Sequence, residues 1–321
     1  MKKQKLGNSD LEITRVGIGA WAIGGSWQWG WGHQNDDDSI AAIRRAVDLG
    51  VNWIDTAPVY GLGHSETIVG KAIKGMKDKP YIFTKCGLRW DERNNDKREA
   101  RSCLKAASVR KEAEDSLKRL GVDAIDLYQI HWPNPNGDIE EAWTEMVKLQ
   151  EEGKVRWIGV SNHSVKQMDR LMKIAPITSL QPPYNYINRT IEAITLPYCQ
   201  DNNIGVIVYS PMASGLLTGR MTAERIAAMP NDDWRKYDFN FTEPQLSRNL
   251  KIVKVMASIA EARGVPTPQI PIAWALKHPA VTAAIVGKRK PAHAEEAIGA
   301  ADLVVSDEEW AKIPCFSWPH H

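Results

Sequence analysis

Four side chains in this sequence are of types that together can move a proton. Asp55 follows the apolar run NWI, Lys85 follows YIFT, His131 follows LYQI, and Tyr60 lies a few residues beyond Asp55. A tyrosine has a pKa of about 10, so it exchanges protons poorly at neutral pH unless a nearby cation stabilises its ionised form. Lys85 can supply that cation.

The other two residues can complete such a site. A lysine held away from bulk water needs a carboxylate partner, and Asp55 is available on the adjacent apolar run. His131 can donate a hydrogen bond to a carbonyl oxygen. Asp55, Tyr60, Lys85 and His131 are therefore candidate catalytic residues, suited to protonating an oxygen as hydride arrives at the neighbouring carbon.

The runs that carry these residues belong to a repeating strand and helix pattern. Short β-branched runs alternate with segments of helical apolar spacing along almost the whole chain. Eight strands are predicted, at residues 16–19, 52–55, 81–85, 125–131, 155–160, 179–181, 206–209 and 283–286. Eight strands that are each followed by a helix close into a parallel barrel, whose strands all present their carboxyl ends at one mouth.

The predicted fold class is therefore α/β, a (β/α)8 TIM barrel in a single domain over residues 1–319. An open sheet with a second domain would need a long Gly- or Pro-rich linker, and the sequence has none. QKLGNSDLEI reads as a β-hairpin ahead of the first strand, and the aperiodic segment 213–243 as a long functional loop after strand 7. Helices are predicted in the segments DDDSIAAIRRAVDLG, SETIVGKAIKG, SVRKEAEDSLKRLG, IEEAWTEMVKLQEEG, VKQMDRLMKI and RTIEAITLPYCQ.

Composition excludes several classes of protein. Of 321 residues, 41 are Lys or Arg and 39 are Asp or Glu, a net charge of 41 − 39 = +2 that argues against a nucleic-acid partner. No apolar stretch is long enough for a signal peptide or a membrane span.

The four cysteines are scattered along the chain, so a reducing cytoplasm is expected. No histidine has a partner at the spacing of metal ligands. His320 and His321 read as a tag remnant.

The motifs, taken in chain order, resemble those of one family. They are WIDTAPVYG, HSETIVGKAI, FTKCG, DLYQIHWP, GKVRWIGVSNHS, LQPPYN and VIVYSPMASGLLTG. Over residues 5–305 the chain is similar to aldo-keto reductases, especially the bacterial branch of general-stress reductases that also resembles potassium-channel β subunits. The resemblance implies that Tyr60 is a general acid, that Lys85 lowers its pKa with Asp55 as partner, and that His131 orients the carbonyl.

The resemblance also implies a nicotinamide cofactor. In the family, the positions that match Ser161, Asn162 and Gln181 hold the nicotinamide carboxamide, and the one that matches Tyr209 stacks on the nicotinamide ring. The loop that passes over the pyrophosphate matches Ser210, Pro211, Met212, Gly215 and Leu217. Ala20, Trp21 and Asp55 are further candidate cofactor contacts. After the last strand, Lys288 and Arg289 follow Gly287 beside a helix start, a suitable cradle for a 2′-phosphate that favours NADP(H). Glu296 fits the family's adenosine site, whereas His293 and Ala297 replace its usual Gln and Asn.

A second dinucleotide signal is the run from Gly17 to Ala22, which satisfies G-x-G-x-x-A after a short strand. The Rossmann fingerprint also needs a helix to begin there and an acidic residue about 20 positions on, at the end of the next strand. The segment IGGSWQWGWGH is too rich in Gly and Trp to begin a helix. We therefore reject the Rossmann interpretation.

Tryptophans gather where the mouth of the barrel is expected. Trp21, Trp27, Trp29 and Trp31 lie in the first connection, and Trp90 and Trp132 follow two of the catalytic strands. Of these, the residues predicted to wall a substrate pocket are Trp29, Trp31, Trp90 and Trp132.

The expected function is NADPH-dependent reduction of a small aldehyde or ketone, such as glyceraldehyde, methylglyoxal or a sugar-type carbonyl. Two alternatives stay open. One is a polyol or alcohol dehydrogenase that works in the oxidative direction, and the other is a cofactor-bound regulatory subunit similar to the channel β proteins. No sequence feature predicts an oligomeric state.

Overall fold

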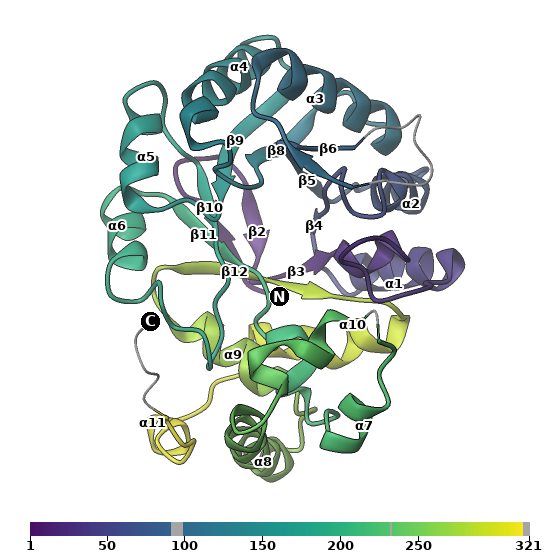
Figure 1. The fold of residues 1–321 in the computed structure, drawn as a ribbon, viewed down its shortest axis with the longest axis vertical. Helices are drawn as coiled ribbons and strands as arrows, with labels where there is room; N and C mark the ends of the chain where they lie inside the picture. Colours follow the sequence, from purple (N-terminus) through teal and green to yellow (C-terminus); the bar gives the residue numbers. More distant parts are fainter. Residues whose placement is uncertain (91–98, 232, 317–321) are drawn as a thin grey trace.

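The computed structural model describes residues 1–90, 99–231 and 233–316, and a closed barrel of eight parallel strands lies at its centre (Figure 1). Strands β12 and β3 pair with each other and close the barrel. Every predicted strand is confirmed, with bounds that differ by at most two residues. The barrel strands are β3 (Val16–Gly19), β4 (Trp53–Asp55), β5 (Tyr81–Cys86), β8 (Ile125–Ile130), β9 (Val155–Ser161), β10 (Ser179–Gln181), β11 (Gly205–Val208) and β12 (Val281–Gly287).

Helices surround the barrel, as Figure 1 shows. The first half of the ring consists of α1 (Asp36–Asp48), α2 (His64–Ile73), α3 (Ala106–Leu120), α4 (Ile139–Glu151), α5 (Val165–Met172) and α6 (Thr195–Asp201). Local chemistry sets their ends: the side chain of Asn35 accepts a hydrogen bond from the backbone N–H of Asp38 at the start of α1. Gly121 ends α3 in the left-handed conformation that glycine adopts without steric cost.

Helix α6 is shorter than the sequence pattern predicted. The expected helix over residues 189–200 begins only at Thr195. Pro197 explains the difference, because it has no backbone N–H to donate and its ring would clash inside a longer helix. In the observed helix Pro197 lies in the first turn, where that N–H is not needed.

The predicted N-terminal hairpin is confirmed as β1 (Lys3–Lys5) and β2 (Glu12–Thr14), which pair antiparallel. Leu6, Leu11 and Ile13 are fully buried and pack with Trp53 and other side chains of the barrel interior. The hairpin thus closes the end of the barrel that lies opposite the carboxyl ends of the strands.

The predicted long connection after β11 is present, and it carries short helical turns. They are η3 (Ala213–Thr218), α7 (Ala223–Ala227), η4 (Trp234–Tyr237) and η5 (Phe239–Phe241). Side chains of Thr222, Asp233 and Asp238 accept backbone N–H groups and cap three of these turns. Each turn is too short for an apolar period to be read from the sequence.

The remaining elements complete the ring and its rim. Beyond the connection lie α8 (Gln245–Arg263), α9 (Gln269–Lys277), α10 (Pro291–Ile298), η6 (Gly299–Ala301) and α11 (Asp307–Trp310), and the rim of the mouth carries η1 (Trp21–Gly24), β6 (Leu88–Arg89), β7 (Arg101–Ser102) and η2 (Asn136–Asp138). In the described ranges, no helix has both the length and the apolar character needed to cross a membrane. His320 and His321 lie outside the described residues.

Candidate active site

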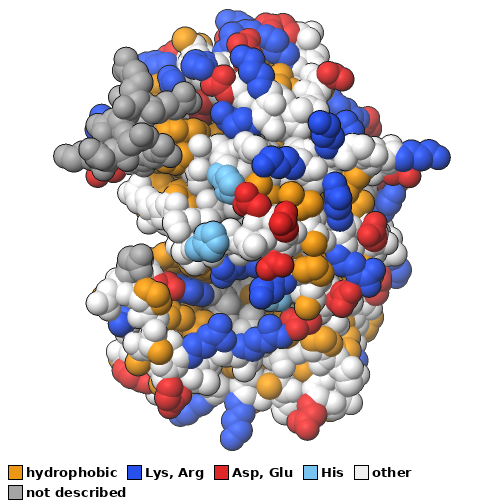
Figure 2. All heavy atoms as spheres, turned by 90° about the vertical axis from the view of Figure 1, so that its right-hand side faces the viewer, with side chains coloured by type: hydrophobic (Ala, Val, Ile, Leu, Met, Phe, Trp, Pro, Cys, Tyr) orange, Lys and Arg blue, Asp and Glu red, His pale blue; other side chains and the backbone are white. Residues whose placement is uncertain are grey.

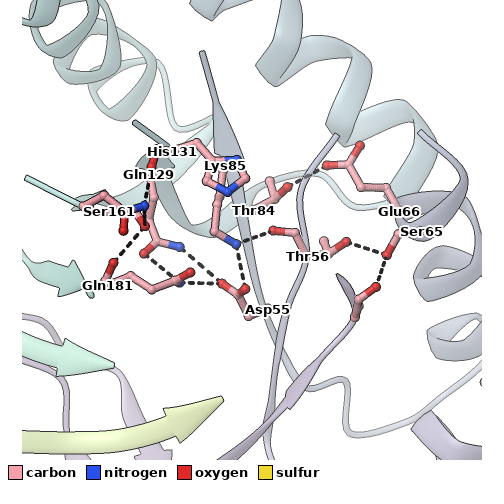
Figure 3. A network of polar contacts seen from close by, with 12 residues as sticks. Asp55, Thr56, Ser65, Glu66, Thr84, Lys85, Gln129, His131, Ser161 and Gln181 are labelled. Atoms are coloured by element: carbon pink, nitrogen blue, oxygen red, sulfur yellow. Dashed lines mark hydrogen bonds and ion pairs between the residues drawn. The ribbon is translucent and has the colours of Figure 1, made fainter. Parts of the chain in front are cut away.

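The polar centre of the site lies inside the carboxyl end of the barrel (Figure 3). Lys85 Nζ donates hydrogen bonds to Asp55 Oδ1 at 2.6 Å and to the backbone oxygen of Thr56 at 2.8 Å. The strand register explains the meeting, since Asp55 ends β4 and Lys85 lies near the end of the neighbouring β5. The Lys85 side chain is 0% exposed, so the ion pair is screened from water and is held by direct contacts.

Two effects act on the pKa of Lys85 in opposite directions. Burial lowers the pKa of its ammonium, whereas the charge and hydrogen bond of Asp55 raise that pKa. The pair is therefore interdependent, because each charge is stable in this interior only while the other is present.

Tyr60 lies beside this pair. Its ring centroid is 5.1 Å from Lys85 Nζ and 5.7 Å from the ring of His131, and the residue is 8% exposed. Burial, with a further contribution from the charge of Asp55, raises the pKa of Tyr60 well above its usual value. The sequence predicted that Lys85 lowers the pKa of Tyr60, whereas burial and the charge of Asp55 act in the opposite direction and dominate.

His131 has the opposite shift. Burial and, secondarily, the charge of Lys85 hold the pKa of His131 well below its usual value. At neutral pH the site accordingly contains a neutral phenol and a neutral imidazole next to a charged pair. Both neutral groups can donate a hydrogen bond to an oxygen.

A second chain of hydrogen bonds runs along the carboxyl ends of the next strands. Tyr209 OH donates to Asn162 Oδ1 at 2.9 Å, and Asn162 Nδ2 donates to Ser161 Oγ and to the backbone oxygen of His131. Ser161 Oγ donates to the backbone oxygen of Gln181 at 2.8 Å. These four of the predicted cofactor residues therefore form one connected rim beside His131.

The predicted pyrophosphate loop bends sharply after β11. Ser210, Ala213, Ser214 and Gly215 all have positive φ, and glycine is the one of these that adopts it without strain. Among the other predicted loop residues, Pro211 and Met212 lie within the bend, whereas Leu217 is fully buried and its side chain packs in the core. Leu217 can therefore face a ligand only through its backbone.

The end of β12 holds a buried cation. Lys288 is 0% exposed, its Nζ has no hydrogen-bond partner among the described residues, and burial lowers its pKa to about 7. Because an isolated ammonium is costly to bury, this orphaned group fits a site that accepts an anion such as a phosphate. Figure 2 views the side of the molecule that lies at the right in Figure 1, and it shows Lys and Arg side chains along the lower edge of a hollow there.

The other residues predicted at this end have partners in the protein. Arg289 Nε donates to Gln34 Oε1 at 2.6 Å, and the backbone N–H of Arg289 donates to His293 Nδ1 at 3.3 Å. The carboxylate of Glu296 forms an ion pair with Arg220 at 2.5 Å. Gly287 is exposed, with open space where a side chain would project.

The first connection of the barrel adjoins the same rim. The backbone N–H of Ala20 donates to the backbone oxygen of Asp55 at 2.9 Å, and the ring of Trp21 lies 4.7 Å from that of Trp31. Only a single 3-10 turn, η1, follows β3, and the next α-helix begins at Asp36. This local structure lacks the long helix that a Rossmann phosphate site requires.

A scan against family models matches residues 15–315 to the Aldo/keto reductase family. The chain belongs to this family. Aldo-keto reductase YhdN of Bacillus subtilis is 42% identical over 92% of this chain and 87% of its own length. The NADH-specific methylglyoxal reductase of Escherichia coli is 32% identical over 96% of both chains. The glycerol dehydrogenase AKR11B4 of Gluconobacter oxydans has a similar structure, with a TM-score of 0.89, 39% identity and coverage of 97% of this chain and 94% of that one.

In this aldo/keto reductase, some of the tryptophans contact the catalytic side chains directly. Among the described residues, Tyr60 has ring contacts with Trp27, at 6.0 Å, and His131. Trp132 stacks on His131 at 6.4 Å, and Trp29 contacts Trp27. Of the other two predicted pocket residues, Trp31 packs against Trp21 and Arg235, and Trp90 lines a surface hollow of about 560 Å³ with Gly24, Gly61 and His64.

Two residues at this site were not among the candidate site residues selected from the sequence. Trp27 belongs to the tryptophan-rich connection, and sequence order did not indicate which of its rings reaches Tyr60. Gln129 is fully buried and contacts Asp55 and Gln181. The sequence feature that could have indicated Gln129 is a polar residue inside the apolar run DLYQIH. Gln129 lies two positions before His131, which places both side chains on the same face of the strand.

The described residues contain no group of three His, Cys, Asp or Glu side chains arranged to hold a metal ion.

Proposed function

We propose that this protein is an NADP(H)-dependent oxidoreductase that reduces small aldehydes or ketones to alcohols. The observation that carries the proposal is the neutral phenol of Tyr60 beside the buried Lys85–Asp55 pair and the neutral imidazole of His131. The Tyr60 phenol is thus a proton donor in a site that is shielded from water.

The mechanism assigns one task to each side chain. When bound, a reduced nicotinamide would supply the hydride for the carbonyl carbon. The O–H of Tyr60 donates its proton to the carbonyl oxygen, and His131 donates a hydrogen bond to the same oxygen and orients it. Lys85 stabilises the phenolate that remains, because its ammonium is 5.1 Å from the ring centroid. Asp55 holds that ammonium in place.

The residues of this chain also fit the cofactor. Asn162 and Gln181 offer amide groups that match a carboxamide, and the ring of Tyr209 is suited to stacking on a planar heterocycle. Lys288 offers for a phosphate an ammonium that has no hydrogen-bond partner among the described residues.

The substrate class follows from chemistry and from relatives. One relative is named a methylglyoxal reductase and another a glycerol dehydrogenase, which act on or form small oxygenated three-carbon compounds. We therefore propose small polar carbonyls, with glyceraldehyde and methylglyoxal first. The test follows nicotinamide absorbance with a panel that also contains an aromatic aldehyde, an aldose and a ketone. Turnover of order 1 s⁻¹ or faster on one class supports the proposal, and binding of NADPH without turnover of any carbonyl favours a regulatory subunit.

The glycerol dehydrogenase similarity supports the oxidative direction as a second candidate, and pH separates the two. Reduction needs the Tyr60 phenol, and the raised pKa of Tyr60 keeps it protonated, so we expect the reduction rate to be flat from about pH 6 to about pH 9. Oxidation needs the phenolate, so its rate should rise about tenfold per pH unit until the pKa of Tyr60 is reached. The check is kcat against pH in both directions, and an oxidation rate that is flat across this range would contradict the assigned base.

The preference for NADP(H) over NAD(H) is tested at the end of β12. Replacing both Lys288 and Arg289 with alanine is expected to weaken NADPH binding by about tenfold to a hundredfold, because charge-assisted contacts to the 2′-phosphate are lost. NADH, which lacks that phosphate, should be affected much less. Fluorescence titration of both cofactors measures the two dissociation constants. Equal losses would place the 2′-phosphate site elsewhere, and Lys290→Ala on the same turn is the matched control.

A further inference from the structure

A buried amide at the centre of the site has no role in the mechanism above. Gln129 lies on β8, in register with Lys85 on β5, and its side chain is fully buried (Figure 3). Its Nε2 donates to Asp55 Oδ2 at 3.4 Å, and its Oε1 accepts a hydrogen bond from Gln181 Nε2 at 3.2 Å. The amide thus touches both the catalytic ion pair and a predicted nicotinamide contact.

The hydrogen bonds fix the orientation of Gln181. Its Nε2 carries two hydrogens, of which one is donated to Asp55 Oδ2 at 2.8 Å and the other to Gln129 Oε1. Both donors are therefore used inside the protein, and Oε1 is the atom that Gln181 can offer to a ligand. An acceptor in this place suits the NH₂ group of a carboxamide.

We propose that Gln129 is a positioning residue that couples the nicotinamide seat at Gln181 to the Asp55–Lys85 pair beside Tyr60. The inference rests on the proposed function. Gln129 supplies the acceptor that holds the Gln181 amide in one orientation and a donor to the second oxygen of Asp55. One side chain thereby sets both where the cofactor ring lies and how the carboxylate meets Lys85.

Removing the amide has two expected consequences. In Gln129→Met, which keeps the length of the side chain, the Gln181 amide loses its acceptor and Asp55 loses a donor. We expect kcat to fall and the dissociation constant of NADPH to rise, each by about tenfold to a hundredfold, the usual range for a lost hydrogen bond to a charged group. Binding of adenosine 2′,5′-bisphosphate, which lacks the nicotinamide, should be unchanged.

These binding measurements separate positioning from a merely structural role. Equal weakening of NADPH and of adenosine 2′,5′-bisphosphate would mean general damage and would overturn the proposal, as would unchanged NADPH binding and kcat. Gln245→Met removes another buried glutamine, on α8 with Asn249 as its partner, and is the control for losing such a residue. Thermal melting of both variants checks folding.

Rescue by Gln129→Glu gives a pH signature. A protonated carboxyl group has a donor and an acceptor, as the amide does, whereas an ionised one would face Asp55 as a like charge. The titratable groups near this position include Asp55 on β4, Lys85 on β5 and His131, two positions further along the chain, with Tyr60 beside Lys85 and His131. We expect this variant to approach wild-type kcat at low pH and to lose activity as pH rises, while Gln129→Met stays impaired at every pH. A Gln129→Glu variant that is as impaired as Gln129→Met at every pH would contradict the proposal.

The proposed function is tested separately by the wild-type protein. If the wild type turns over no carbonyl or alcohol, the proposed function fails, yet the comparison of NADPH with adenosine 2′,5′-bisphosphate still tests whether Gln129 orders the nicotinamide seat. If the wild type is active and Gln129→Met matches it, only the inference about Gln129 fails.

Discussion

Replacing Tyr60 with phenylalanine is expected to lower kcat for carbonyl reduction by about 10²- to 10⁴-fold, the usual contribution of a positioned general acid. The substitution removes only the phenolic oxygen, and the ring keeps its packing against Trp27 and His131. The affinity for NADPH should therefore change little. Steady-state kinetics and a fluorescence titration of the cofactor measure the two quantities.

The specificity of that loss can be checked with a second tyrosine. Tyr237 lies in the long connection after β11 and is 66% exposed, so Tyr237→Phe removes a phenolic oxygen from an exposed side chain and not from the buried ion-pair site. This variant should retain wild-type kcat. Turnover that survives Tyr60→Phe would remove Tyr60 as the acid, since no proton can come from the phenylalanine ring.

Replacing Lys85 with methionine is expected to damage both stability and turnover. Asp55 would keep its contacts with Gln181 and Gln129 but would lose its positive partner in a buried site. Breaking a buried ion pair on one side typically costs about 3–5 kcal/mol of unfolding free energy. Catalysis should fall nearly as far as in Tyr60→Phe, because nothing then stabilises the phenolate. Urea unfolding and kcat measure the two effects.

A double variant separates these two losses. Asp55→Asn combined with Lys85→Met removes both charges, so much of the lost unfolding free energy should return. Turnover should stay low, because the cation beside Tyr60 is still missing. Recovery of activity together with stability would mean that Lys85 acts only as a structural partner. A double variant as unstable as Lys85→Met would mean that the buried charge of Asp55 is not the cause.

Strand positions were accessible from the sequence because each barrel strand is a short apolar run that ends in a polar residue. Asp55, Lys85 and Gln181 were identified in this way, and closure of the barrel brings them together whatever their separation in the chain. The helix over 189–200 shows the limit of this reasoning, since apolar spacing continued through residues where Pro197 prevents an α-helix.

The sequence did not predict the direction in which the pKa of Tyr60 is shifted. A lysine near a tyrosine suggested a lowered phenol pKa, yet burial and Asp55 raise the pKa of Tyr60. The sign depends on how much water the fold excludes and on whether the lysine charge is already paired. Neither quantity has a signature in residue order.

The sequence by itself determined the family, the order of the eight strands and the identity of the side chains at their carboxyl ends. These depend on local periodicity and on motifs, which are properties of short segments. Only the tertiary structure decided that Trp27 lies beside Tyr60, that Lys288 is buried with no partner in the described part of the chain, and that Gln129 joins Asp55 to Gln181. Such contacts join segments from different strands and connections, and their geometry exists only once the barrel has closed and its interior is packed.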